Sequence, residues 1–314
     1  MNNVLIVGGT RFLGLAIAEA FLRKGGFRVC EMNRGTRPGM EGLEKSFHCD
    51  KNDREAFAQV LKDRPWDVII DTILNDADLE FVIGTLKSDV GHFIHTGSIG
   101  VYGDARHIPA PEWLPMSELE SDEEVVFNQK LRQDQILLRA CLEKRFPASI
   151  LRMSNVYGRG DIPLDGWGGR NPEYFRKLLR GEVMEVPENG RALLQPGHVA
   201  DLGRAFLLCA ERPESIGQVY NICGETSLML KDYIRLVAKT LDAPAPVFEF
   251  LDRDTLMQRR PELSRHGLDF VCQHMCSDIR KAEAQLSWRP EIPLEAGLRD
   301  NFAWMKEKDL LSSK

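Results

Sequence analysis

A glycine-rich turn near the N-terminus carries the first residues with recognisable chemistry. Gly8-Gly9-Thr10-Arg11-Phe12-Leu13-Gly14 follows the apolar run 4–7 and leads into a segment of helical periodicity. Such a turn lets backbone N–H groups and a helix N-terminus face a pyrophosphate, and its last glycine allows a helix to pack closely on a strand. Arg11 stands where the usual pattern has its middle glycine. The placement between a strand and a helix predicts a dinucleotide site, and the alternative is a plain tight turn.

The end of the second apolar run lacks the acidic residue that a dinucleotide site usually offers to ribose hydroxyls. Asn33-Arg34-Gly35-Thr36-Arg37 stands there instead. A guanidinium suits a 2′-phosphate, so Arg34 favours NADP over NAD, although Arg34 and Arg37 can also be interpreted as solvated loop charges. After the third run, Asp50 is placed to accept a hydrogen bond from an adenine amino group. The alternative is that Asp50 caps the helix that follows.

Alternating strands and helices must position these residues. Up to residue 152, short β-rich apolar runs alternate with longer segments whose apolar residues recur at i, i+3 and i+4. We expect strands at 4–7, 27–32, 46–49, 66–71, 92–95 and 148–152, and helices at 12–24, 52–62, 76–87 and 122–145. This order predicts an α/β fold built on a Rossmann-type, doubly wound parallel sheet.

The rest of the chain is expected to form a smaller, mixed α/β C-terminal lobe for substrate. Helices are predicted at 172–179, 198–209 and 231–241, with short strands between them. The Gly- and Pro-rich loops 103–121 and 158–172 are long enough to be functional, and we expect them to close over a ligand. We therefore predict a dinucleotide-binding domain at 1–157, to which later segments return, and a lobe at 158–314 that mainly binds substrate.

The composition argues against several classes of protein. The 314 residues are 43% hydrophobic and 28% charged, which supports a packed core and argues against disorder. With 41 Lys and Arg against 47 Asp and Glu, the net charge of −6 gives nucleic-acid binding no overall support. No apolar run approaches the roughly 20 residues of a membrane span, and no export signal is expected. Seven scattered cysteines predict a reducing cytoplasm rather than a disulfide framework.

Two further clusters are assigned no site. Cys272-Gln273-His274-Met275-Cys276 matches no common zinc spacing and lacks a second pair of ligands, so no metal is expected. The arginines between 253 and 265 alternate with acidic residues, which favours a solvated charged face over a contact with RNA.

Motifs along nearly the whole chain resemble the extended branch of the short-chain dehydrogenase/reductase superfamily, the NAD-dependent epimerases and dehydratases. Besides the glycine turn, they are TGSIGVYG (96–103), KLRQDQIL (130–137), LRMSNVYG (151–158), GHVADL (197–202), GQVYNI (217–222) and LSWRP (286–290). The last three look like the C-terminal lobe of that branch. The form of the glycine turn, the Asn-Arg-Gly after the second strand and the tail 273–304 are similar to an atypical subgroup, which includes chloroplast stem-loop RNA-binding proteins and bacterial relatives.

The resemblance implies a catalytic set that this chain carries only in part. In the family, a Ser or Thr at the position of Ser98, a Lys at that of Lys130 and a Tyr four residues before the lysine act together. The lysine lowers the pKa of the tyrosine, whose phenolate takes a proton from substrate, and it also holds the cofactor ribose. Here Val126 stands at the tyrosine position and cannot exchange a proton. The alternative for Lys130 is a solvated helix lysine.

The same resemblance assigns other residues to the substrate side. Tyr102, four residues after Ser98, is a candidate substitute acid, and the favoured alternative is a phenol that packs or lines a sugar pocket. Asn155, with Tyr157 close by, would hold a substrate phosphate or sugar, unless Asn155 only forms a turn. Arg191 would bind a nucleotide diphosphate. His198 falls in the same region, but bracing a helix start explains it better.

The predicted function is that of an NADP- or NAD-binding homologue of these enzymes, an epimerase, dehydratase or reductase acting on a nucleotide-linked sugar or a related small molecule. The glycine turn would hold the pyrophosphate, Asn33, Arg34 and Asp50 would bind the adenosine end, and Lys130 the ribose. The alternative is a non-redox nucleotide- or RNA-binding protein on the same fold, and a third interpretation is a cofactor sensor. The resemblance also implies a homodimer formed through 76–87 and 122–145.

Overall fold

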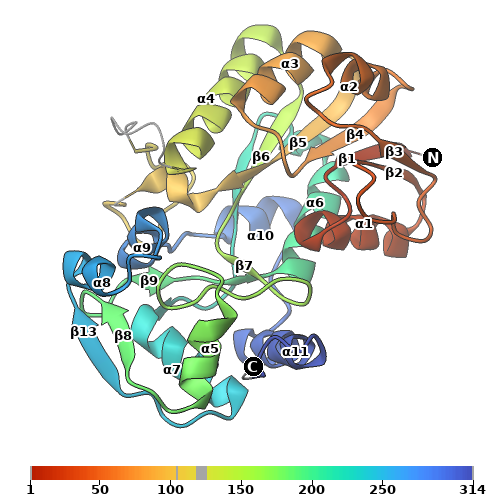
Figure 1. Cartoon of the computed structure of the whole chain (residues 1–314). Coiled ribbons are helices and arrows are strands. Elements are labelled where there is room, and N and C mark those ends of the chain that lie inside the picture. Colours follow the sequence, from red (N-terminus) through yellow and green to blue (C-terminus); the bar gives the residue numbers. More distant parts are fainter. Residues whose placement is uncertain (1, 104, 118–125, 313–314) are drawn as a thin grey trace.

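The central element of the fold is a seven-stranded parallel sheet (Figure 1). The computed structural model describes residues 2–103, 105–117 and 126–312, and the strand order is β3-β2-β1-β4-β5-β6-β11. These strands are β1 (Asn2–Val7), β2 (Phe27–Asn33), β3 (Lys45–His48), β4 (Trp66–Asp71), β5 (Val90–Ser98), β6 (Ala148–Met153) and β11 (Val219–Ile222). The order reverses between β1 and β4, and sheets of this kind bind ligands beside such a reversal.

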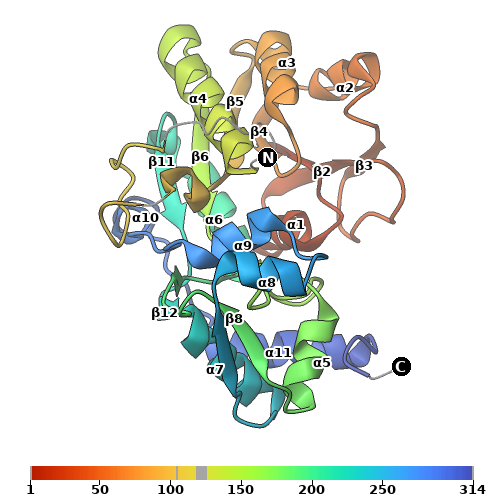
Figure 2. The same cartoon turned by 60° about the vertical axis from the view of Figure 1, so that its left-hand side comes forward.

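Helices cover both faces of the sheet (Figures 1 and 2). One face carries α2 (Arg54–Leu61), α3 (Asp76–Leu86) and α4 (Val126–Lys144), and the other carries α1 (Phe12–Lys24), α6 (Val199–Ala210) and α10 (Arg280–Leu286). In β1, Leu5 and Val7 pack towards the first group, whereas Val4 and Ile6 pack towards the second. An apolar run buried on both faces is typical of a parallel sheet. The predicted doubly wound α/β fold is confirmed.

The smaller lobe packs short strands and helices around an apolar cluster that includes Tyr174, Phe175, Tyr233 and Phe302. Its strands are β7 (Val156–Tyr157), β8 (Met184–Pro187), β9 (Leu193–Leu194), β10 (Gly197–His198), β12 (Leu228–Met229) and β13 (Phe248–Leu251), and they pair two by two. Its helices are α5 (Pro172–Leu179), α7 (Leu230–Leu241), α8 (Arg253–Arg259), α9 (Arg265–Cys272) and α11 (Leu294–Glu307). The C-terminus lies in this lobe (Figure 1). The boundary near residue 157 stays a prediction.

Late segments of the chain return to the main sheet. β11 pairs in parallel with β6 as the edge strand, so the placement of 217–222 in the C-terminal lobe is wrong. α6 packs across α1, and fully buried Trp288 donates a hydrogen bond from Nε1 to the Asp201 carbonyl at 2.9 Å. A short apolar strand takes its place from the partner that buries it, which its own sequence does not specify.

The remaining predictions concern loops and helix ends. The predicted helix 122–145 starts outside the described residues, and α4 is described from Val126. Short 3₁₀ helices, η1 (Ile99–Tyr102) and η2 (Pro213–Ser215), follow β5 and α6. The loop 158–172 is packed, because Asp165 accepts hydrogen bonds from the N–H groups of Trp167, Gly169 and Asn171 at 2.8–3.0 Å. Among the described helices, none is long and apolar enough to cross a membrane.

Candidate functional site

The carboxyl ends of neighbouring strands surround an open hollow. In the parallel register, Val7 of β1 lies beside Met32 of β2 and Asp71 of β4, so the turns after these strands begin at one level. The hollow has a volume of about 600 Å³ and is lined by the glycine turn, by the segments after β2 and β3, and by Ile73 after β4. Its position beside the reversal of strand order is that of a nucleotide site in an α/β sheet.

The geometry of the glycine turn fits the close approach of a phosphate. Gly8 has a φ of +99°, a backbone conformation that residues with a Cβ rarely adopt. A Cβ at Gly14 would lie 2.0 Å from the Gly8 carbonyl oxygen, so only glycine lets α1 start this close to β1. Arg11 occupies the N-cap position without a capping hydrogen bond from its side chain. The N–H groups of the first turn of α1 are therefore left for a ligand at the hollow.

The end of β2 turns its polar groups inward. The Asn33 amide nitrogen donates to Glu31 Oε1 and Ser46 Oγ, both at 3.0 Å, and its oxygen accepts from the Gly35 N–H at 2.6 Å. Glu31 is fully buried, and Gly9 lies so close that a Cβ there would be 2.7 Å from Glu31 Oε2. The one carboxylate of β2 therefore points beneath the glycine turn. Asn33 lines the hollow, but its amide hydrogens are already used.

Guanidinium groups surround the same hollow without partners. Arg11, Arg34 and Arg37 are exposed and line it. Within the part of the chain that the structure describes, no ion pair or side-chain hydrogen bond engages any of the three. Cations that face a cavity without a counter-ion favour an anionic ligand, and a guanidinium can bind a phosphate through two parallel hydrogen bonds.

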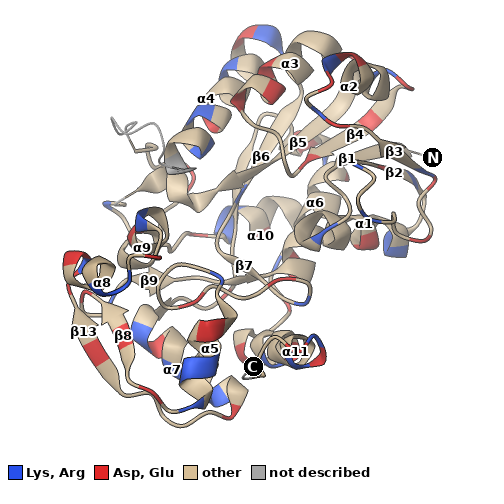
Figure 3. Ribbon diagram, in the orientation of Figure 1, with Lys and Arg blue, Asp and Glu red and all other residues tan. Residues whose placement is uncertain are grey.

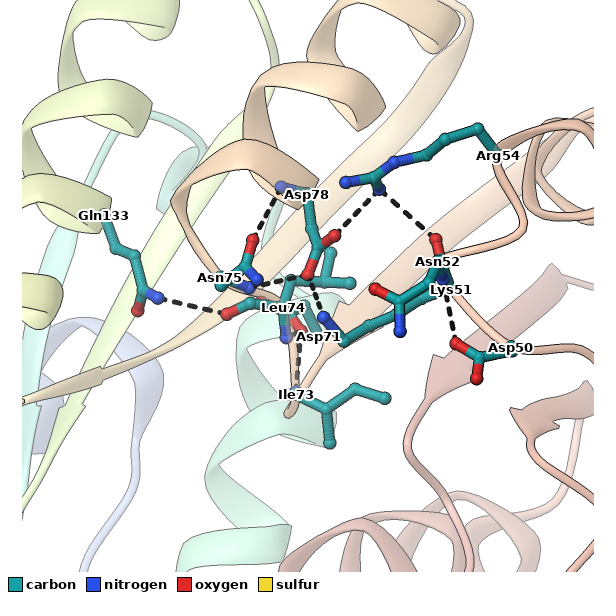
Figure 4. Close-up of polar contacts among 10 residues, drawn as sticks. All are labelled: Asp50, Lys51, Asn52, Arg54, Asp71, Ile73, Leu74, Asn75, Asp78 and Gln133. Atoms are coloured by element: carbon teal, nitrogen blue, oxygen red, sulfur yellow. Dashed lines mark hydrogen bonds and ion pairs between the residues drawn. The ribbon is translucent and has the colours of Figure 1, made fainter.

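The turn after β3 is fixed by a buried carboxylate on α3 (Figure 4). Asp50 accepts a hydrogen bond from the Asn52 N–H at 2.9 Å, and the α2 cap is Asp53, which accepts from the Ala56 N–H at 3.0 Å. The capping alternative for Asp50 is therefore wrong. Lys51 lines the hollow, but its ammonium group pairs with Asp78.

Asp78 holds several groups at once (Figure 4). Its side chain is 1% exposed, pairs with Arg54 at 2.8 Å and completes a capping box with Asn75 at the start of α3. Burial alone would raise the pKa of Asp78, but the hydrogen bonds from the Asn75 N–H and from Lys51 outweigh it and lower that pKa. The charged carboxylate thus ties the turn after β3 to the turn after β4.

The turn after β4 forms one wall of the hollow and is held from two sides (Figure 4). Asp71 Oδ1 accepts from the N–H groups of Ile73 and Leu74 at 2.8 and 2.7 Å, while Gln133 of α4 donates to the Leu74 carbonyl at 3.1 Å. Ile73 is 47% exposed beside the hollow. An exposed apolar side chain on a rigid turn can pack against a flat ring of a ligand.

Lys130 lies where α4 meets the end of β5. Its Nζ donates to the Thr96 carbonyl at 3.0 Å, and the Thr96 hydroxyl donates to the Asp71 carbonyl at 2.7 Å. Ser98 lies two residues further along β5, and its Oγ accepts from the Gly100 N–H at 3.1 Å. Burial lowers the pKa of Lys130, although the carboxylates of Asp71 and Asp134 oppose the shift.

Tyr102 belongs to a buried hydrogen-bond network. Its hydroxyl accepts from Arg152 Nη1 and donates to Asn221 Oδ1, both at 2.8 Å, and the residue is 4% exposed. Arg152 in turn pairs with Asp134 at 2.8 Å, and both side chains are almost fully buried. Burial raises the pKa of Tyr102 to about 12, in spite of the nearby Arg152. These contacts favour the packing interpretation of Tyr102 over the role of a proton carrier.

Three of the four residues expected on the substrate side lie close together, because β7 pairs with β10 and the Asn155 carbonyl accepts from the Gly197 N–H at 3.0 Å. Asn155 is 7% exposed, and neither polar atom of its amide has a partner within the described chain. Tyr157 is buried against His198, with ring centroids 5.2 Å apart. His198 Nδ1 accepts from the Ala200 N–H at 3.3 Å at the start of α6, and burial lowers its pKa. Arg191 lies on an exposed turn, and no hydrogen bond between described residues joins it to the other three.

Comparison with known proteins shows a similarity to one family of enzymes. The model of the NAD dependent epimerase/dehydratase family matches residues 79–223. The chain is similar to this family over a little under half of its length. It is 27% identical to the chloroplast stem-loop binding protein of 41 kDa b of Arabidopsis thaliana, over 96% of this chain and 78% of that protein. It is 22% identical to dTDP-L-rhamnose 4-epimerase of Burkholderia thailandensis, over 98% of this chain and 96% of the enzyme.

Solved structures of epimerases and dehydratases share the fold. A dTDP-glucose 4,6-dehydratase of Bacillus anthracis in complex with NAD superimposes with a TM-score of 0.78 at 17% identity, covering 99% of this chain and 100% of that one. A UDP-glucose 4-epimerase of Thermotoga maritima with UDP-glucose gives 0.74 at 18% identity, covering 98% and 99%. At such identities the match shows the fold alone.

Several charged residues that shape this site were not predicted as site residues. Glu31 and Arg152 stand between apolar residues in the buried parts of β2 and β6, and Asp134 follows Lys130 by one helical turn. A charge inside an apolar strand signals a buried partner, because an unpaired ion is costly to bury. That signal was present in the sequence for Glu31 and Arg152. The partners themselves come from other elements and required the fold.

Proposed function

We propose that this protein binds NADP in preference to NAD and catalyses an epimerase-, dehydratase- or reductase-type reaction on a nucleotide-linked sugar or a related small molecule. The observation that carries the proposal is the hollow, where a glycine turn, a free helix N-terminus and the unpaired Arg11, Arg34 and Arg37 meet. The relative named as a dTDP-L-rhamnose 4-epimerase supports this class of substrate. The solved structures named with NAD and with UDP-glucose support the fold's capacity for such ligands.

The residues around the hollow fit a dinucleotide. The glycine turn and the first N–H groups of α1 would hold the pyrophosphate, and Asp50 would accept from the adenine amino group. Ile73 would pack against a ring, and Lys130 would hold the ribose next to the nicotinamide. When bound, the nicotinamide supplies a carbon that accepts and returns a hydride.

The preference for NADP rests on the end of β2. A site for NAD places a carboxylate there to accept from the ribose hydroxyls. Asn33 occupies that place with its amide hydrogens used, and the Glu31 carboxylate points beneath the glycine turn. Arg34 and Arg37 stand free beside it, and a guanidinium is a partner for a 2′-phosphate rather than for a hydroxyl.

On the substrate side, we propose that Ser98 orients the reacting oxygen and that Asn155 binds a sugar or phosphate oxygen. The Ser98 Oγ accepts from the Gly100 N–H, which leaves its proton available to a substrate oxygen. Asn155 offers a donor and an acceptor that no described residue uses. A buried amide without partners is costly in the free protein, and a ligand would remove that cost.

The experiment that tests the cofactor site is a fluorescence titration of the full chain with NADPH and with NADH. Arg34→Ala should weaken NADPH binding by about 10- to 100-fold, because a charge-assisted hydrogen bond to the 2′-phosphate is lost. It should leave NADH binding nearly unchanged. The matched control is Arg28→Ala, at the amino end of the same strand, where Arg28 pairs with Glu44. If neither cofactor binds to the natural chain, the proposed function is wrong.

We also propose a homodimer formed through α3 and α4, in a reducing cytoplasm. Leu142 of α4 is 84% exposed, which an interface on this face would cover, and all seven cysteines are free thiols. Light scattering of Leu142→Glu against the natural chain tests the dimer. A natural chain with the mass of one subunit would contradict it.

A second candidate function is the binding of structured RNA. It is favoured by the similarity to a protein named for stem-loop binding and by the same unpaired arginines. A filter-binding assay with a stem-loop RNA over a salt series tests it, because each phosphate contact makes affinity fall with salt. Affinity that does not respond to salt or to Arg34→Ala and Arg37→Ala would exclude this site as an RNA contact.

A further inference from the structure

The described residues leave the proton step of the proposed reaction without its usual carrier. Val126 is the first residue of α4 and has no titratable group. The Tyr102 hydroxyl is engaged by Arg152 and Asn221 at 2.8 Å in a buried network. Ser98 can orient an oxygen but is a weak acid and a weak base. Among the described residues, Lys130 of α4 brings a titratable group to the end of β5.

Lys130 is held rigidly at that place. Its Nζ donates to the Thr96 carbonyl at 3.0 Å, two residues before Ser98 on the same strand. The neighbouring residues of α4 fix the helix: Arg132 pairs with Asp76 at 2.6 Å, and Gln133 donates to the Leu74 carbonyl (Figure 4). A proton-transfer group is effective only when its atom is positioned within hydrogen-bond reach of the reacting oxygen.

The carboxylates around Lys130 form hydrogen bonds and ion pairs with other residues. Carboxylates face it from β4, α3 and α4, namely Asp71, Asp76 and Asp134. Asp71 is hydrogen-bonded to His95 at 2.6 Å, and Asp134 pairs with Arg152 at 2.8 Å, as Asp76 does with Arg132. Within the described residues, no ion pair joins Lys130 to any of them. A partly buried ammonium without a direct counter-ion releases its proton more readily, and desolvation lowers the pKa of Lys130.

We propose that the Lys130 amine itself exchanges the proton with the substrate hydroxyl in this protein. This inference rests on the proposed function. In the oxidising direction, neutral Lys130 takes the hydroxyl proton and becomes an ammonium. An oxidised nicotinamide cofactor, held by the glycine turn, would supply the acceptor for the hydride that leaves the carbinol carbon with its electron pair, so that the carbinol would become a ketone. In the reducing direction, the ammonium returns the proton to the carbonyl oxygen as the hydride returns to carbon.

The first test follows the ionisation of Lys130 directly and needs no substrate. Protein labelled with ¹³C at the lysine ε-carbon is titrated by NMR with NADP⁺ present, and the Lys130 signal is assigned by its loss in Lys130→Arg. The exposed Lys87 is the internal control. We expect Lys130 to lose its proton at a lower pH than Lys87. A Lys130 signal that titrates together with Lys87 or above it would overturn the proposal.

The second test separates proton transfer from the binding of ribose. Turnover of UDP-glucose, UDP-galactose and dTDP-glucose with NADP⁺ is compared in the natural chain, Lys130→Arg, Val126→Tyr and the double variant. Lys130→Arg keeps the positive charge but not the exchangeable proton, so turnover should fall by about 10²- to 10⁴-fold while NADPH binding stays within about threefold. Turnover of the double variant should be at least about tenfold higher than that of Lys130→Arg alone.

The outcomes of these tests are distinct. Lack of NADPH binding to the natural chain would remove the proposed function and with it the role of Lys130. A second outcome is that the cofactor binds and Lys130→Arg lowers turnover by the same factor with Val126 as with Val126→Tyr. Lys130 would then only hold the ribose, and the proposal would be wrong. If the cofactor binds but none of the three nucleotide sugars reacts, the NMR titration of Lys130 alone supports or overturns the proposal.

Discussion

The arginines of the hollow and those of α8 differ in their partners. Arg11, Arg34 and Arg37 face the hollow, and within the described chain none of them has an ion-pair partner. Arg253, after β13, pairs with Asp269 at 2.9 Å, and Arg259 pairs with Glu249 at 2.8 Å. Acidic and basic segments lie side by side in that part of the smaller lobe (Figure 3).

The difference separates two uses of the same side chain. Exposed pairs such as those of α8 gain little stability, because water screens the attraction and two long side chains must be ordered. The free arginines gain none from pairing, and their mutual repulsion is a small cost. Their position beside the glycine turn is explained by an anionic ligand. Exposure alone does not identify such a site; here the lack of ion-pair partners coincides with a glycine turn and a helix N-terminus at the same hollow.

A third kind of arginine, the buried Arg152, should show the largest effect on substitution. Arg152→Met would leave Asp134 buried without a counter-ion and break the bond to Tyr102, at a cost of about 3–5 kcal/mol of unfolding free energy. Burial alone would lower the pKa of Arg152, but the Asp134 carboxylate outweighs it and raises that pKa. Urea denaturation measures the change. A loss below about 1 kcal/mol would place Arg152 with the exposed arginines instead.

Asp78 should show the next largest effect, with a definite pH dependence. Asp78→Asn removes the charge that holds Lys51 and Arg54 and should cost about 2 kcal/mol at pH 7. The folded pKa of Asp78 lies below its ordinary 3.8, so its charge stabilises the protein above that pH, and the contribution is lost as the pH falls through the folded pKa. Urea titrations of both proteins at several pH values should show the difference shrinking in acid. A difference that is constant with pH would assign the loss to packing.

Arg11 should have a smaller effect, on binding rather than on stability. Arg11→Gly restores the usual glycine of the turn and removes one free cation, so NADPH and NADH should both bind about five- to tenfold more weakly, a change of about 1 kcal/mol. The factor should be the same for both cofactors because Arg11 lies at the start of α1 and not at the end of β2. Fluorescence titration measures both affinities. A selective loss of NADPH would move Arg11 to the 2′-phosphate.

The smallest effect is expected for the paired arginines of the smaller lobe. Arg253→Ala removes exposed contacts to Glu188 and Asp269 and should cost less than about 1 kcal/mol of stability. NADPH affinity should not change. Thermal unfolding and the same titration provide the measurements. A loss of cofactor affinity here would abolish the distinction between free and paired arginines.

Much of the fold followed from local patterns. The predicted strands 66–71 and 148–152 and the helices 12–24 and 172–179 agree with the structure within a residue, because each is a long apolar or amphipathic run with clear ends. The Gly-Gly-Thr-Arg turn likewise lies between β1 and α1 and lines the hollow. The place of β11 in the main sheet was missed, because four residues do not encode which neighbour they pair with.

The sequence by itself determined the parallel sheet, the glycine turn beside it and the absence of a tyrosine at position 126, because each depends on residues close together in the chain. Only the tertiary structure decided which polar groups are free. Tyr102 is engaged by Arg152, 50 residues away, and by Asn221, 119 residues away, whereas Arg11, Arg34 and Arg37 have no ion-pair partner among the described residues. Partners for hydrogen bonds and charges are brought together by packing, and local sequence carries no record of which distant element will supply them.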